Sequence, residues 1–130
     1  MDLLFKLSDT LHESQKERGL TGAYLNSARA TFGPELITQR KSLDTSIEKL
    51  NLFLFNEYSN SALTMTETFI KGLVDQYNIP NLRQYIDDNT ITAAVAISTY
   101  TKLNDRLVAS IGLVVSNSGS SLTTLEQSEA

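Results

Sequence analysis

Two arginines stand where a helical pattern calls for apolar residues, and they are the side chains best suited to bind a ligand. Arg18 lies on a stripe that recurs every three or four residues, and Arg40 interrupts a second stripe of this kind. A guanidinium that faces a bundle core is unfavourable unless an anion neutralises it, and no acidic residue occupies either stripe. Because the planar fork of arginine donors fits planar oxyanions, we expect a small anion to supply the missing charge.

Three neutral polar side chains complete the candidate set. Gln15 lies one turn before Arg18, while Thr101 and Asn104 interrupt the stripe of a later helix. Each would add a neutral hydrogen bond and orient a bound anion. A structural alternative stays open, because a seam arginine can extend along its stem to water and seam amides often only fix helix register. A seam threonine can likewise bond its own helix backbone.

The composition excludes several other kinds of site. The 130 residues include no cysteine, which rules out disulfides, thiolate metal sites and cysteine nucleophiles. His12 is the one histidine, so a metal site with several histidines is impossible, and we expect it to be a partly exposed residue on a helix surface. The net charge of −4 argues against a nucleic-acid partner. We therefore expect a protein that is not an enzyme and needs no metal or cofactor.

The elements that position these residues follow from the periodicity. Apolar residues recur with helical spacing over four segments, at about 3–25, 34–55, 61–77 and 91–115. Short connections make neighbouring helices antiparallel. The expected fold class is therefore all-α, a four-helix, mostly antiparallel up-down bundle over residues 1–115. No stretch reaches the roughly 18–20 apolar residues of a transmembrane span.

Turn and cap residues mark the expected ends of these helices. Gly33-Pro34 opens the second, because a proline in the first turn loses no helical hydrogen bond. Asn78–Pro80 ends or kinks the third, ahead of one or two helical turns around Leu82–Ile86. Asp88–Thr90 offers an N-cap to the fourth. Residues 116–130 are expected to form a serine-rich tail or the start of a further helix.

The depth of each polar residue in the bundle predicts one shared layer. With a turn near residue 30, Arg18 and Arg40 come to a similar depth, and Thr101 and Asn104 fall in the same half. The predicted core-facing stripes are Leu4, Leu7, Leu11, Gln15, Arg18, Gly22 and Leu25; Leu36, Arg40, Leu43, Ile47, Leu50 and Leu54; Leu63, Thr66, Ile70, Leu73 and Tyr77; and Ala94, Ile97, Thr101, Asn104, Val108, Ile111 and Val115.

Three segments carry a family resemblance. The segment His12–Leu25, HESQKERGLTGAYL, resembles the signature of the nitrate- and nitrite-sensing (NIT) domain family, whose first helix typically reads HELQKERG. Phe32–Arg40 resembles the start of that family's second helix, and Tyr100–Asn104 resembles its Y-T-x-L-N motif. The resemblance covers most of residues 3–115. It departs from the motif at Ser14, where leucine is usual; that position lies off the predicted stripe, so we expect the change to be tolerated.

The resemblance implies an all-helical sensor that binds nitrate or nitrite and passes a helix displacement to an output domain. It assigns the anion-binding arginine of helix one to Arg18, makes Gln15, Thr101 and Asn104 motif positions, and places Arg40 at a recurrent position. Such modules stand outside the membrane in chemotaxis receptors and sensor kinases, or act in cytoplasmic antiterminators. We expect the periplasmic part of a bacterial inner-membrane receptor, attached only through transmembrane segments absent from this chain. A cytoplasmic location is the alternative.

The length of the chain bears on the expected partner. The family usually continues into a second set of helices with another arginine motif, whereas this sequence ends at Ala130. We therefore expect that half of an anion clamp is either absent or supplied by the second subunit of a homodimer. Two alternatives remain: a bundle that senses a different small organic ligand, and a structural or dimerisation bundle without a ligand.

Overall fold

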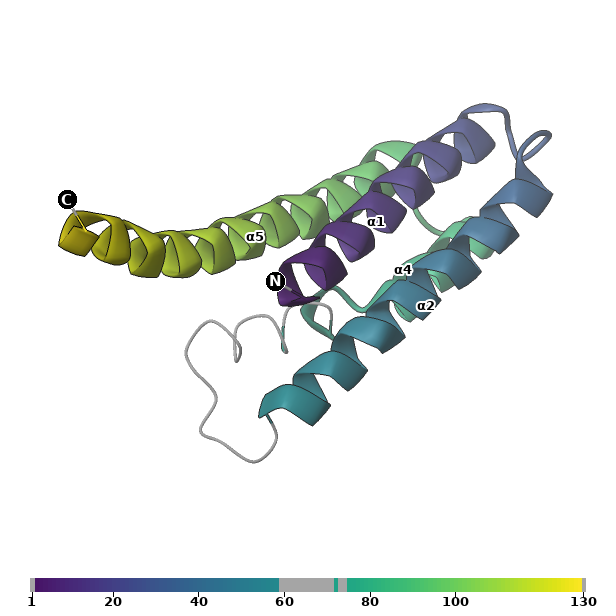
Figure 1. Ribbon diagram of the computed structural model, residues 1–130. Helices are drawn as coiled ribbons and strands as arrows, with labels where there is room; N and C mark the ends of the chain where they lie inside the picture. Colours follow the sequence, from purple (N-terminus) through teal and green to yellow (C-terminus); the bar gives the residue numbers. More distant parts are fainter. Residues whose placement is uncertain (1, 59–71, 73–74, 130) are drawn as a thin grey trace.

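The computed structural model describes residues 2–58, 72 and 75–129 and forms an all-α bundle (Figure 1). Its helices are α1 (Asp2–Asn26), α2 (Gly33–Tyr58), α4 (Ile79–Asp87) and α5 (Ala93–Glu129), and the described residues include no strand. The predicted fold class is thereby confirmed. The helix predicted over 61–77 lies almost entirely outside the described residues.

Side-chain contacts fix the direction of the helices relative to α1. Gln39 of α2 donates to the Glu13 carbonyl oxygen at 3.0 Å, whereas Ser46, two turns later, bonds Asp9 at 2.8 Å. On the other flank, Arg18 meets Thr101. A Cβ added at Gly22 would lie 3.2 Å from Cδ1 of Ile97, which precedes Thr101 in α5. Both α2 and α5 therefore run antiparallel to α1, as the short connections predicted.

The buried line of α1 differs from the predicted stripe. It runs through Leu3, Leu7, Thr10, Ser14, Glu17 and Thr21, each at most 9% exposed. Gln15 is exposed, and Leu4, Leu11 and Arg18 are only partly buried. The prediction that Gln15 faces the core is therefore wrong. The stripe was misplaced because α1 packs between two helices and fills its central line with small polar residues and one glutamate, which a hydrophobicity pattern reads as surface.

Helix α2 follows its predicted stripe closely. Its apolar members Leu36, Leu43, Leu50 and Leu54 are at most 3% exposed, and the helix begins at Gly33 as expected. The predicted stripe omits two buried polar residues that face α1. Gln39 donates to Glu13, and Ser46 bonds Asp9.

Helix α4 begins at the predicted break. Asn78 takes a left-handed conformation with φ 44° and accepts a hydrogen bond from the Asn81 amide, with Pro80 in the first turn. Its buried residues are Ile79, Leu82 and Ile86. The predicted short helical segment is thus a helix of nine residues.

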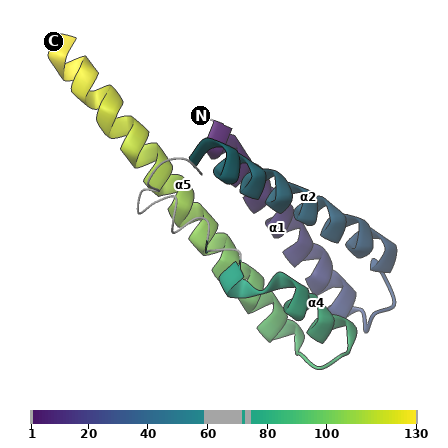
Figure 2. The same cartoon turned by 90° about the horizontal axis from the view of Figure 1, so that it is seen from below.

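Helix α5 differs from the prediction at both ends. Thr92 caps it by accepting from the Val95 amide at 3.2 Å, so the predicted cap at Asp88–Thr90 is wrong. The predicted end at Val115 is absent, because the helix continues to Glu129 and passes well beyond the other helices (Figures 1 and 2). None of the helices in the described residues is long and apolar enough to cross a membrane.

The face that α5 turns to the core is rotated from the predicted one. Ala96, Tyr100, Leu103 and Leu107 are at most 1% exposed and join the core of α1, α2 and α4. Val108 and Val115, predicted in the stripe, are about half exposed, at 53% and 47%; Ala94 is also exposed. The apolar surface of α5 is therefore wider than one core requires.

Candidate functional site

Four polar side chains meet where α1 packs against α5, and we name them the Arg18 layer: Ser14, Arg18, Thr101 and Asn104. Arg18 Nη1 donates to Thr101 Oγ1 at 3.3 Å. One turn away, the Ser14 hydroxyl donates to Asn104 Oδ1 at 2.5 Å. Because the two helices are antiparallel, residues one turn apart on α1 meet residues one turn apart on α5. The predicted convergence of Arg18, Thr101 and Asn104 is therefore seen.

The Arg18 layer carries hydrogen-bonding capacity that the described residues leave unused. Arg18 is partly buried and makes no ion pair within the described part of the chain. Asn104 is 3% exposed, and its Nδ2 has no hydrogen-bond partner among the described residues. A buried N–H donor such as Asn104 Nδ2 is unfavourable without an acceptor, and a partly buried guanidinium is stabilised by a nearby negative charge. The layer thus has the electrostatic character of an anion-binding site.

Arg40, the second predicted arginine, faces a different helix. Its Nη1 lies 2.9 Å from Asp87 Oδ2 of α4, and the Asp87 side chain is 52% exposed. Position 40 lies on the flank of α2 that turns toward α4, whereas Gln39 turns toward α1. The prediction that Arg40 converges on the same layer as Arg18 is therefore wrong, although the two residues do lie at a similar depth.

A buried ion pair occupies the centre of the bundle, and the sequence pattern missed it. The Glu17 side chain is fully buried and binds Arg83 of α4 through two contacts, Nε–Oε2 at 3.0 Å and Nη2–Oε1 at 2.8 Å. The Tyr100 hydroxyl of α5 also donates to Glu17 Oε2. Arg83 extends to α2, where it contacts Asp44 Oδ1 at 2.6 Å and the Arg40 carbonyl oxygen at 3.1 Å. This cluster joins all four described helices.

The electrostatics of this cluster hold its charges fixed. Desolvation alone would lower the pKa of Arg83, but the hydrogen bonds and charges of Glu17 and Asp44 outweigh it and raise the pKa. Burial, and then the adjacent Glu17 carboxylate, raise the pKa of Tyr100. Arg83 therefore stays cationic and Tyr100 neutral at ordinary pH. Because Glu17 and Asp44 already neutralise Arg83, this arginine serves the fold and does not suit an external anion.

The signal for this ion pair was present in the sequence but indirect. Glu17 falls on the line of positions 3, 7, 10, 14 and 21, which has helical spacing but carries leucine only at 3 and 7 and small polar residues at 10, 14 and 21. Its partner Arg83 lies 66 positions later in a short helix. Neither local spacing nor composition links the two.

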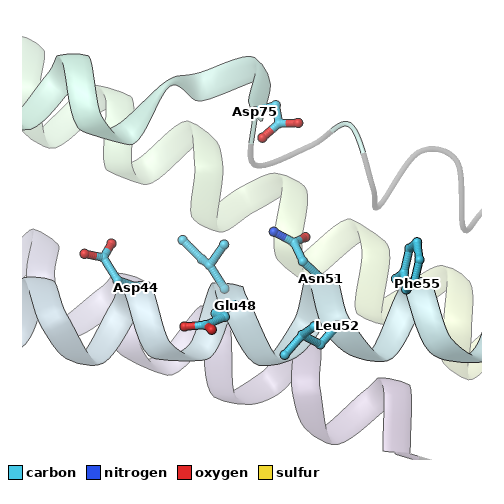
Figure 3. Close-up of a pocket in the computed structure, with 7 residues that line it drawn as sticks. Asp44, Glu48, Asn51, Leu52, Phe55 and Asp75 are labelled. Atoms are coloured by element: carbon cyan, nitrogen blue, oxygen red, sulfur yellow. The ribbon is translucent and has the colours of Figure 1, made fainter.

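A cavity of about 580 Å³ lies away from the Arg18 layer, along the surface of α2 (Figure 3). Its charged lining residues are all carboxylates, so it does not suit an anion. All of its lining residues except Asp75 belong to α2: they are Asp44, Ile47, Glu48, Asn51, Leu52, Phe55 and Asp75. Among the residues that the structure describes, no group of three or more histidine, aspartate or glutamate side chains is arranged to hold a metal ion.

The fold and the site define a class of protein, an all-α bundle with a polar layer between two helices, in which Arg18 has no ion-pair partner among the residues that the structure describes. The family model described as nitrate and nitrite sensing (NIT) matches residues 9–126. The chain therefore belongs to the NIT family, a family of sensing domains, and the resemblance seen in the sequence is confirmed. No curated protein and no solved structure matches the chain.

Proposed function

We propose that this chain is the ligand-binding sensor domain of a bacterial signal-transduction receptor and that it binds nitrate or nitrite at the Arg18 layer. The observation that carries the proposal is the set of hydrogen-bond donors in that layer that have no negatively charged partner among the described residues. Arg18 makes no ion pair within the described residues, and one helical turn away the buried Asn104 amide keeps a free N–H donor. A small oxyanion accepts from both groups and neutralises the guanidinium.

The proposed mechanism is binding without chemistry. An anion bound by Arg18, Thr101 and Asn104 bridges α1 and α5 and favours one relative position of these helices. Gln15 approaches the anion from the solvent side of the layer, three residues before Arg18. The free energy that drives the signal is the difference in anion affinity between two helix arrangements.

The proposed setting is the periplasmic part of an inner-membrane chemoreceptor or sensor kinase, with a cytoplasmic sensor as the alternative. We also propose a homodimer in which the second subunit completes the anion clamp. The half-exposed Val108 and Val115 support an apolar contact along α5, because burying such side chains favours association. Light scattering at several protein concentrations, with and without nitrate, tests this, and a monomer under all conditions contradicts it.

A thermal-shift titration tests ligand binding. Sodium nitrate should raise the melting temperature relative to sodium chloride at equal ionic strength, because a ligand at a hundredfold excess over its Kd stabilises the fold by about 2.7 kcal/mol. Arg18→Ala should abolish the shift. Lys49→Ala removes the same charge from an exposed position on α2 and should leave the shift intact. The proposal fails if nitrate gives no shift or if Arg18→Ala leaves the shift unchanged.

The same titration separates the alternatives. A shift with formate, acetate or an amino acid, but not with nitrate or nitrite, identifies a sensor for a different organic ligand. An absence of any ligand dependence, together with stable oligomers, identifies a structural bundle in which the Arg18 layer only fixes helix register.

A further inference from the structure

Ser14 occupies an unexpected place in the Arg18 layer. Its side chain is fully buried on the central line of α1, not off the core as the sequence pattern predicted. Its hydroxyl donates to Asn104 Oδ1 at 2.5 Å. An apolar side chain at this position could not make the bond.

The Ser14 hydroxyl bonds the oxygen end of the Asn104 amide and leaves the nitrogen end without a partner among the described residues. An asparagine side chain offers one acceptor oxygen and one NH₂ donor. With the oxygen held by Ser14, the NH₂ group remains, and it is buried without a partner among the described residues. The Thr101 hydroxyl oxygen accepts from Arg18, so its own proton is available to donate. Three residues of the layer therefore present donors.

We propose that Ser14 is a positioning residue that makes the Arg18 layer selective for ligands with acceptor atoms only, such as a small oxyanion. This inference rests on the proposed function. Without the hydroxyl, the Asn104 amide is free to turn its oxygen toward the Arg18 guanidinium one turn away. That oxygen would satisfy the arginine internally and compete with the anion.

Two substitutions of equal shape isolate the hydroxyl. Ser14→Thr keeps it, and Ser14→Val replaces it by a methyl group in a side chain of nearly the same volume. We expect calorimetric titration with sodium nitrate to show about tenfold weaker binding for Ser14→Val, the loss of one hydrogen bond to a charged ligand. Ser14→Thr should bind within a few-fold of the parent chain. Equal affinities for the two variants overturn the inference.

A double-mutant cycle distinguishes positioning from a general effect on the fold. In an Asn104→Ala background there is no amide to orient, so exchanging Ser14→Thr for Ser14→Val should leave nitrate affinity unchanged. A tenfold difference that persists in this background overturns the inference.

The proposed function has its own control. Nitrate binding that is absent from the parent chain, or intact in Arg18→Ala, refutes both proposals. Nitrate binding that depends on Arg18 but not on the Ser14 hydroxyl refutes only this one.

Discussion

Arg83→Met should destabilise the fold strongly, although Arg83 lies outside the proposed ligand site. Methionine keeps an unbranched apolar stem but removes the guanidinium, so it isolates the charge from the packing. The fully buried Glu17 carboxylate then keeps only the Tyr100 hydroxyl as a partner among the contacts described above. Leaving one charge of a buried pair without its partner typically costs about 3–5 kcal/mol.

The size of the expected loss of stability depends on how deeply each partner of Arg83 is buried. Its two contacts with Glu17 are to a side chain of 0% exposure, whereas the Asp44 side chain is 60% exposed and adds at most about 1 kcal/mol. Nearly the whole effect should therefore come from Glu17. The matched control is Lys16→Met, which removes the same charge from a pair with Glu13 in which the Lys16 side chain is 47% exposed. Its cost should be about 0.2–0.5 kcal/mol.

Urea denaturation followed by far-ultraviolet circular dichroism measures both variants at neutral pH. The double variant Glu17→Gln/Arg83→Met should lose less stability than the sum of the two single variants, because it leaves no buried charge uncompensated. A cost for Arg83→Met within about 1 kcal/mol of that for Lys16→Met would refute the reasoning. Strict additivity in the double variant would refute it as well.

The remaining predictions concern pH and the backbone. Because the pKa of Tyr100 is raised in the fold, its contribution to the free energy of unfolding is complete below the unfolded pKa of about 10 and is lost as pH rises further, by up to about 1.4 kcal/mol per pH unit. In denaturation at alkaline pH, Tyr100→Phe should therefore lose stability less steeply than the parent chain, and an equal slope would contradict this. Gly19→Ala should raise stability by about 0.5–1 kcal/mol because the added Cβ meets nothing within 4 Å. Gly22→Ala should gain less, because its Cβ would lie 3.2 Å from a side chain. A higher melting temperature for Gly22→Ala than for Gly19→Ala would contradict this prediction. Asn78→Ala should cost about 1 kcal/mol of stability through the lost helix cap. Asn78→Gly should cost less, since glycine adopts the left-handed backbone conformation readily. A larger loss for Asn78→Gly than for Asn78→Ala would contradict this reasoning.

The sequence predicts α2 well and α1 less well, for a physical reason. In α2 four leucines occupy most of the buried positions, so the hydrophobic period marks the buried face directly. In α1 the buried line carries leucine only at its start and small polar or charged residues from Thr10 onward, and burial of Glu17 depends on Arg83 from another helix. A one-dimensional pattern cannot contain that pairing, so it placed the stripe on a neighbouring line of the helix.

Part of the candidate site follows from depth alone. Counting residues from the turns brings Arg18, Thr101 and Asn104 to one level, and the contact between α1 and α5 then joins them. Counting residues from a turn gives the depth of a residue but not which neighbouring helix it faces, so the prediction placed Arg40 beside Arg18 although it faces α4. The role of Gln15 as a ligand-binding residue remains a prediction.

Because α5 is long, a small tilt at the Arg18 layer produces a larger displacement at the C-terminal end of this helix. From Asn104 to Glu129 the helix continues for 129 − 104 = 25 residues, which at 1.5 Å per residue is about 37 Å. The far end passes beyond the other helices as a single uninterrupted rod (Figure 2). A tilt of about 2° with its pivot at the layer therefore moves the tip of that rod sideways by about 1.3 Å. Under the proposed mechanism, a small tilt of α5 on anion binding would therefore become a displacement on the scale of a side-chain contact at its far end.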